Sequence, residues 1–171
     1  IRRDWFWNTK NADTLKSLDK LMDIYYRTVG HGAVLLLNLT PDTTGRIPET
    51  DARRAAEFGA EIKRCFGQSV AETSGTGDTV ELDLKQSTPI DHVVSMEDIT
   101  QGERVRAYSI EGFSNGAWKT LCQGSAIGHK KIDRFDAVSV EKIRLRVHQS
   151  AAPPQIRKLA VYDVGTIRAV R

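Results

Sequence analysis

The densest run of apolar residues in the chain is AVLLL, at residues 33–37. A Gly-rich turn precedes this run, and a loop that contains Pro, Asp and Gly follows it. Every position in the run is apolar, whereas a strand with one face in water would alternate apolar and polar residues. The pattern therefore predicts a parallel strand over residues 33–39 that is covered on both faces by helices.

The segments on both sides of this run have helical patterns. In residues 14–29 apolar side chains recur every three or four positions with charged residues between them, which predicts an amphipathic helix capped by Asp13 or Thr14. A second helix is predicted over residues 50–66, with an inner side rich in Ala and Gly. One strand between two helices cannot bury both of its faces without further strands. We therefore interpret residues 1–67 as the C-terminal end of a larger α/β domain.

The pattern changes at Gln68, where helical periodicity gives way to short strand-like segments separated by turns. Alternation is clearest in residues 142–148, where Ile, Leu and Val alternate with Arg and His. Seven strands are predicted, over residues 80–84, 90–96, 104–113, 118–122, 131–135, 142–148 and 156–164. Their regular spacing indicates an all-β antiparallel sandwich over residues 68–171.

Composition and charge argue against several classes of protein. The net charge is +3, with Lys and Arg interleaved among Asp and Glu, so we expect no nucleic-acid partner. No apolar stretch is long enough for membrane insertion. Cys65 and Cys122 have no metal-ligand spacing, so we expect isolated thiols, no metal site and no cofactor. The first residue is Ile1 and no signal peptide is visible, so we expect a piece of a longer protein.

An ordered series of residues resembles one enzyme family. WFWN at residues 5–8, followed by LKSLDKLMDIYYRTVGHGAVLLLNLTPDTTGRI at residues 15–47, is similar to the end of the catalytic domain of α-L-fucosidases of glycoside hydrolase family 29. The match is better to the branch that acts on α1,3/α1,4-linked (Lewis-type) fucose. Residues 118–131 and 156–164 also resemble the C-terminal sandwich of those enzymes, a galactose-binding-like jelly roll.

The resemblance implies a fold and an activity. Residues 1–67 would be the last αβα part of a (β/α)8-like TIM barrel, with residues 33–39 as its last or nearly last strand, and residues 68–171 would form a supporting sandwich. The parent protein would be a retaining exo-α-L-fucosidase that hydrolyses terminal α-linked L-fucose from glycans. Both catalytic carboxylates of the family lie upstream of this stretch. We therefore expect no catalytic residue here, an inactive fragment, and two partners: a fucosylated oligosaccharide and the upstream catalytic part.

Three residues are candidates for binding the substrate. Trp5 stands where the family places an aromatic ring against the apolar side of fucose, and Trp7 follows it in the pattern. Asn38 closes the predicted strand at the end where barrel active sites lie. Two other interpretations stay open: Trp5 could pack into a core, and the Asn38 amide could tie down the neighbouring loop backbone.

A function of another class also fits the sequence. The chain could be a non-catalytic carbohydrate-binding or adhesion module of discoidin-like type, provided that the sandwich exposes Trp118 and basic residues on one face. Family habit implies a periplasmic or secreted location, or a lysosomal one in a eukaryote.

Overall fold

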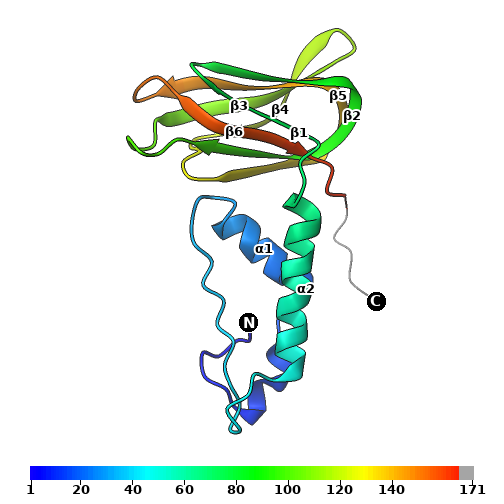
Figure 1. Cartoon of the computed structure of the whole chain (residues 1–171), viewed down its shortest axis with the longest axis vertical. Coiled ribbons are helices and arrows are strands. Elements are labelled where there is room, and N and C mark those ends of the chain that lie inside the picture. The colour runs from blue at the N-terminus through cyan, green and yellow to red at the C-terminus, as the bar shows by residue number, and fades with distance from the viewer. Residues whose placement is uncertain (166–171) are drawn as a thin grey trace.

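The computed structural model describes residues 1–165, so residues 166–171 at the end of the expected sandwich domain lie outside the described part. A helical part and a β sandwich are stacked along the long axis of the molecule (Figure 1). The second helix ends at Phe66 and the first strand begins at Ala71.

The helical part begins with a 3-10 helix, η1 (Thr9–Thr14), followed by α1 (Leu18–Thr28). The predicted caps of α1, Asp13 and Thr14, are wrong. These residues belong to η1, which the Asn8 side chain caps by accepting from Lys10 N at 2.9 Å. The N-cap of α1 is Ser17, whose Oγ accepts from Lys20 N. The predicted amphipathic face is confirmed, with its apolar side chains buried: Leu18, Leu21, Met22, Tyr25 and Tyr26.

The second helix, α2 (Glu49–Phe66), matches its prediction within a residue. Its inner side matches the prediction in part, because Ala55, Ile62 and Phe66 pack against the helical core. Phe58, Glu61 and Cys65 are buried, whereas Gly59 is exposed. Large aromatic side chains from α1 and the sandwich leave no room for the close backbone approach that small residues would favour. Tyr25, for example, packs edge-on against Phe58 with ring centroids 6.2 Å apart.

Residues 33–39, predicted to be a parallel strand, have no strand pairing in the structure. The segment is extended and runs beside the helices away from the sandwich (Figure 1). A strand requires a neighbour to complete its hydrogen bonds, and residues 1–165 contain none beside this segment. Val34 and Leu36 are 90% and 79% exposed, while Leu35, Leu37 and Leu39 pack partly against the helical core. We call residues 33–40 the extended segment.

The sandwich contains six antiparallel strands in the hydrogen-bonded order β1-β6-β2-β5-β3-β4. They are β1 (Ala71–Thr76), β2 (Thr79–Glu97), β3 (Val105–Ser114), β4 (Ala117–Gly124), β5 (Lys131–Ser150) and β6 (Gln155–Tyr162). The antiparallel sandwich is confirmed, but the strand boundaries differ. Two pairs of predicted strands fuse into the long strands β2 and β5, and β1 was not predicted.

The two long strands pass from one layer of the sandwich to the other. Their ladder is interrupted between Asp83 and Thr88 and again between Ile90 and His92. Lys85 adopts a left-handed conformation at the first interruption, with φ 68°. Such irregularities bend paired strands, so each half of β2 and β5 joins a different layer. The second half of β2 pairs with β6, and the second half of β5 pairs with β3.

Two apolar cores follow from this arrangement. The first fills the space between the two layers and includes Tyr108, Ile110, Ile143 and Leu145. The second joins α1 and α2 to the near layer of the sandwich, through Val94, Ile132, Ala160 and Tyr162 among others. The helical part is therefore anchored to the sandwich by a continuous apolar contact.

Candidate functional site

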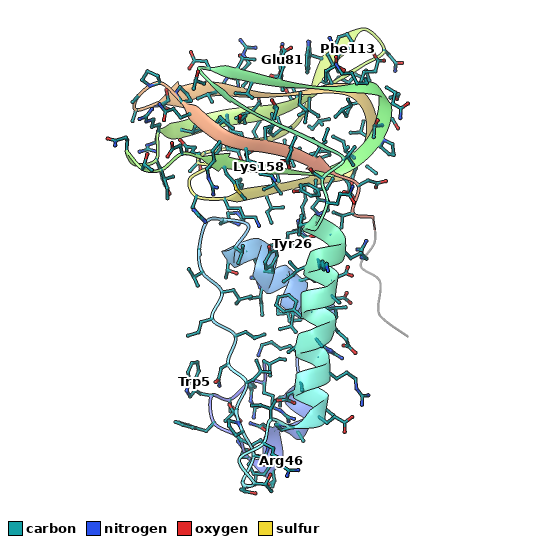
Figure 2. The ribbon with its side chains drawn as sticks, in the orientation of Figure 1. Trp5, Tyr26, Arg46, Glu81, Phe113 and Lys158 are labelled. Atoms are coloured by element: carbon teal, nitrogen blue, oxygen red, sulfur yellow. The ribbon has the colours of Figure 1, made fainter. Side chains whose placement is uncertain are left out.

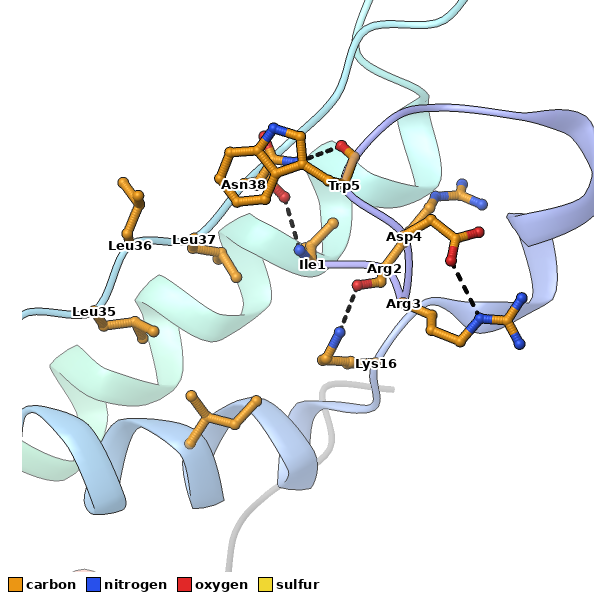
Figure 3. A pocket seen from close by; sticks show the side chains of 11 residues that line it. Ile1, Arg2, Arg3, Asp4, Trp5, Lys16, Leu35, Leu36, Leu37 and Asn38 are labelled. Carbon is orange, nitrogen blue, oxygen red and sulfur yellow. Dashed lines mark hydrogen bonds and ion pairs between the residues drawn. The ribbon is translucent and has the colours of Figure 1, made fainter.

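A groove of about 260 Å³ lies between the N-terminal residues and the extended segment, at a distance from the sandwich (Figures 2 and 3). Its walls come from three pieces of chain that are far apart in sequence. The lining residues are Ile1, Arg2, Arg3, Asp4, Trp5, Lys16, Ile24, Leu35, Leu36, Leu37 and Asn38. One side of the groove is therefore apolar and the other carries basic groups.

The Trp5 ring stands at the mouth of this groove and is 59% exposed. The Trp5 ring therefore packs into no core formed by residues 1–165. The Trp5 carbonyl accepts two hydrogen bonds, from Asn38 Nδ2 and from Thr40 Oγ1, each 2.7 Å long (Figure 3 draws the first). Asn38 Nδ2 also donates to Thr40 Oγ1 at 2.9 Å. The Trp5 backbone is fixed, while its ring remains open to a ligand.

Asn38 thus ties down the loop backbone, as one of its two interpretations predicted. Both hydrogens of its amide are used, on the Trp5 carbonyl and the Thr40 hydroxyl. The backbone carbonyl of Asn38 accepts from Ile1 N at 2.7 Å. These bonds place Asn38 in the groove wall, beside Trp5, with its amide group turned to the protein.

Trp7 does not line the same groove as Trp5. It is half-buried and borders a separate cavity of only about 10 Å³, together with Phe6, Asn11 and Asn38. This space is too small to hold a sugar and about large enough for one water molecule. The structure therefore places Trp7 behind the groove and Trp5 at its mouth.

A buried ion pair supports this region from the helix side. Arg2 Nη2 lies 2.7 Å from Asp51 Oδ1 and Arg2 Nε lies 2.8 Å from Asp51 Oδ2, so the contact is bidentate. Arg2 Nη1 also donates to the Asn11 carbonyl. The Asn11 amide in turn donates to the Phe6 carbonyl at 3.2 Å. The first turn of α2 thereby holds both ends of the loop that carries Trp5.

Asp4 is the one carboxylate that lines the groove within residues 1–165. The Asn8 amide donates to Asp4 Oδ2, and this bond, with the Arg3 guanidinium, lowers the pKa of the Asp4 carboxyl. The group is therefore ionised at neutral pH. Retaining glycosidases use two carboxylates about 5 to 5.5 Å apart, and the groove, as residues 1–165 form it, contains no such pair.

Several residues of this region were not predicted from the sequence. Thr40, Arg2, Asn11 and Asp51 act through contacts between residues up to 49 positions apart. No local motif marks them. Only the short spacing of Asn38 and Thr40 at the end of an apolar run could have suggested a joint role.

The sandwich face remote from the helices carries Trp118, as the rival interpretation requires. Trp118 is half-buried, and the Arg144 guanidinium lies 4.2 Å from its ring centroid. Arg144 Nε also donates to Glu111 Oε2 at 2.6 Å. Figure 2 shows the nearby Phe113 at the end of the molecule farthest from Trp5. The Trp118 ring is partly covered by a paired arginine, which disfavours it as an open sugar platform.

The junction of the helices and the sandwich contains a buried polar chain. His92 Nδ1 and Asp91 Oδ1 are 2.6 Å apart, and the Tyr26 hydroxyl lies 3.1 Å from His92 Nε2. Asp91 also accepts from the backbone of Val164 and Gly165. Burial is the largest effect on His92 and lowers its pKa, against the opposing pull of Asp91. This chain is closed to solvent and its role is structural.

Two general features concern the described residues only. No group of three His, Cys, Asp or Glu side chains within residues 1–165 is arranged to hold a metal ion. None of the helices there is long and apolar enough to cross a membrane.

Comparison with known families shows similarity to one group of glycoside hydrolases. Residues 1–64 match the family model of the alpha-L-fucosidases. Alpha-L-fucosidase 1 of Arabidopsis thaliana is 25% identical over 199 residues, which cover 95% of this chain. This chain spans 38% and 39% of the length of its curated relatives from rice and Arabidopsis.

Solved structures agree with the family match. A Bacteroides thetaiotaomicron protein assigned as an α-L-fucosidase is 40% identical, with a TM-score of 0.92 over 95% of this chain and 38% of that chain. A family 29 fucosidase of Ruminococcus gnavus, solved in complex with fucose, is 26% identical, with a TM-score of 0.83 over 95% of this chain and 40% of that chain. The chain is thus similar, in sequence and fold, to the C-terminal region of family 29 α-L-fucosidases, including their β sandwich.

Proposed function

We propose that this chain is the C-terminal portion of a retaining exo-α-L-fucosidase that removes terminal α-linked L-fucose from glycans. Residues 1–67 would complete its (β/α)8-like catalytic barrel, and the galactose-binding-like sandwich would support that barrel. The match of residues 1–64 to the fucosidase family supports the proposal. The resemblance of the sequence to the Lewis-type branch favours α1,3- or α1,4-linked fucose as the substrate.

The unpaired extended segment is the observation that carries this proposal. Within residues 1–165, no partner accepts from or donates to the backbone of residues 34–37. Val34 and Leu36 point into solvent, and the Phe6 ring, next to Trp5 in the sequence, is also exposed. An unpaired edge next to exposed apolar side chains is unfavourable unless another surface covers it. Neighbouring barrel strands would pair with this backbone and bury these side chains.

In this arrangement the groove would form one wall of the fucose pocket. The Trp5 ring would lie against the apolar side of the sugar, near its methyl group, where stacking also excludes water. Trp7 and Asn38 would complete this wall from behind, and the exposed Trp5 ring supports this assignment. The upstream part would supply both carboxylates, one as the nucleophile and the other as the acid and base. The fragment alone would then hydrolyse nothing.

The test uses the complete polypeptide that carries this chain. With 4-nitrophenyl α-L-fucoside as the substrate, we expect hydrolysis with retention of the anomeric configuration. NMR of the fucose first released measures that configuration. Trp5→Ala should raise KM at least about tenfold, because stacking is lost in both the ground and transition states. The isolated chain should show no turnover. Inversion, a preference for another sugar, or turnover by the isolated chain would contradict the proposal.

A carbohydrate-binding or adhesion role for the sandwich is the weaker alternative, because Arg144 covers the Trp118 ring. Fucose or galactose binding by the isolated chain that is abolished by Trp118→Ala, and not by Trp5→Ala, would favour it. A periplasmic or secreted enzyme agrees with extracellular glycans as substrates. Fractionation of the source cells would test that location.

A further inference from the structure

Trp5 reaches the groove mouth without ring contacts of its own. No aromatic ring or cation within residues 1–165 packs against the indole, in contrast to Trp118, which is held by Phe113 and Arg144. A side chain that is more than half exposed has several accessible rotamers, and a mobile ring stacks poorly on a sugar. The position of this ring therefore depends on how firmly its backbone is held.

The backbone at Trp5 is held by the extended segment through one small network. Thr40 Oγ1 donates to the Trp5 carbonyl at 2.7 Å and accepts from Asn38 Nδ2 at 2.9 Å. Asn38 Nδ2 donates its other hydrogen to the same carbonyl. The single hydroxyl of Thr40 thus takes part in two of the three bonds, and its loss would leave Asn38 with one acceptor fewer.

Other contacts hold the loop beyond Trp5. The Phe6 carbonyl accepts from Asn11, and the Asp4 carboxylate accepts from Asn8. These contacts come from η1 and its cap, so they do not connect the loop to the extended segment. Within the described residues, three hydrogen bonds join the N-terminal residues to the extended segment. Two are accepted by the Trp5 carbonyl, and the third runs from Ile1 N to the backbone carbonyl of Asn38.

We infer that Thr40 is a positioning residue for substrate binding: together with Asn38 it fixes the Trp5 backbone, so that the indole faces the fucose. The inference rests on the proposed fucosidase function for its kinetic consequence. The structural consequence, a more mobile Trp5 ring when the Thr40 hydroxyl is lost, does not depend on the fucosidase function.

The kinetic test compares Thr40→Val and Thr40→Ser in the complete polypeptide. Valine has the shape of threonine but no hydroxyl, whereas serine keeps the hydroxyl. We expect Thr40→Val to raise KM for 4-nitrophenyl α-L-fucoside about fivefold with kcat within about twofold, because stacking acts on bound substrate and transition state alike. Thr40→Ser should restore KM to within about twofold of the parent. Thr44→Val is the matched control and should leave KM unchanged, because Thr44 Oγ1 donates to Asp42 Oδ1 in the following loop and not to the Trp5 carbonyl.

A double-mutant cycle separates a positioning role from direct contact with the sugar. If Thr40 acts through Trp5, Thr40→Val should have no further effect on KM in a Trp5→Ala background. An effect that persists there overturns the inference. If Trp5→Ala raises KM and Thr40→Val does not, the inference fails while the proposed function stands.

A spectroscopic measurement is independent of turnover. With 5-fluorotryptophan incorporated into the complete polypeptide, Trp5→Phe identifies the Trp5 resonance in the 19F spectrum. Thr40→Val should shift and narrow the Trp5 resonance and leave those of Trp7 and Trp118 unchanged, since a freer ring averages its environment. An unchanged Trp5 resonance would overturn the inference even if the enzyme proved to act on another sugar.

Discussion

At the scale of single residues, the groove depends on one buried charge pair. The side chains of Arg2 and Asp51 are 9% and 2% exposed, and their contact is bidentate. Replacing Asp51 by Asn leaves the Arg2 charge buried with a weaker partner. Such a loss costs about 3 to 5 kcal/mol, because the remaining charge stays desolvated.

We expect Asp51→Asn to lower the free energy of unfolding by about 3 kcal/mol in urea titrations followed by circular dichroism. Glu49→Gln is the matched control on the same helix turn, because Glu49 pairs with Arg53 at 2.9 Å on the surface. Its effect should stay within about 0.5 kcal/mol. Equal effects of the two substitutions would show that burial of the Arg2 pair contributes nothing special.

At the scale of secondary-structure elements, the junction of α1 with β2 carries the pH sensitivity of the fold. His92 is buried there and its pKa is lowered from 6.5, with burial as the largest cause. The titratable groups around it come from four elements: Tyr26 of α1, Arg64 of α2, Asp91 of β2 and Arg134 of β5. His92 therefore binds a proton more readily in the unfolded state than in the folded state. The free energy of unfolding is highest above the pKa of His92 in the unfolded state and decreases as the pH falls below that value.

We therefore expect the urea concentration at the unfolding midpoint of the parent chain to decrease as the pH is lowered from about 7 to about 5.5. His92→Gln should make this decrease smaller. Asp91, whose pKa is lowered, loses its contribution only at a pH below about 4, so it does not interfere in this window. His148→Gln, at an exposed position, should keep the slope of the parent. A slope that survives in His92→Gln would assign the pH dependence to other groups.

The same scale shows what the sequence could predict. Both helices and the alternating strands were predictable, because the spacing of apolar residues differs between helices and strands and shows which side of each element is buried. The short strand β1 was missed, since AETSGT has the composition of a turn. The fusion of β2 across Lys85 was missed because a bend within a paired strand and a true turn have the same polar sequence. A hydrogen bond such as that from Thr40 to Trp5, 35 positions away, leaves no local pattern at all.

At the scale of the whole molecule, the two ends of the structure differ in what they expose. The sandwich exposes paired charges, such as Lys85 with Asp83. The helical part presents an unpaired backbone and the exposed side chains of Phe6, Val34 and Leu36. This asymmetry is what a barrel interface on the helical part requires, with the sandwich on its outer side.

Leu36 makes this asymmetry measurable, because one substitution should have different costs in two contexts. In the isolated chain Leu36→Asp should change the free energy of unfolding by less than about 0.5 kcal/mol, since the side chain is already in water. In the complete polypeptide the same change should cost about 3 kcal/mol or more, because it removes a buried leucine and buries a carboxylate. Val70→Asp, at a half-exposed position beside β1, is the control and should cost little in both contexts. Urea unfolding of the six proteins, the parent and the two variants in each context, supplies the comparison. An equal cost of Leu36→Asp in both contexts would show that no barrel covers the extended segment.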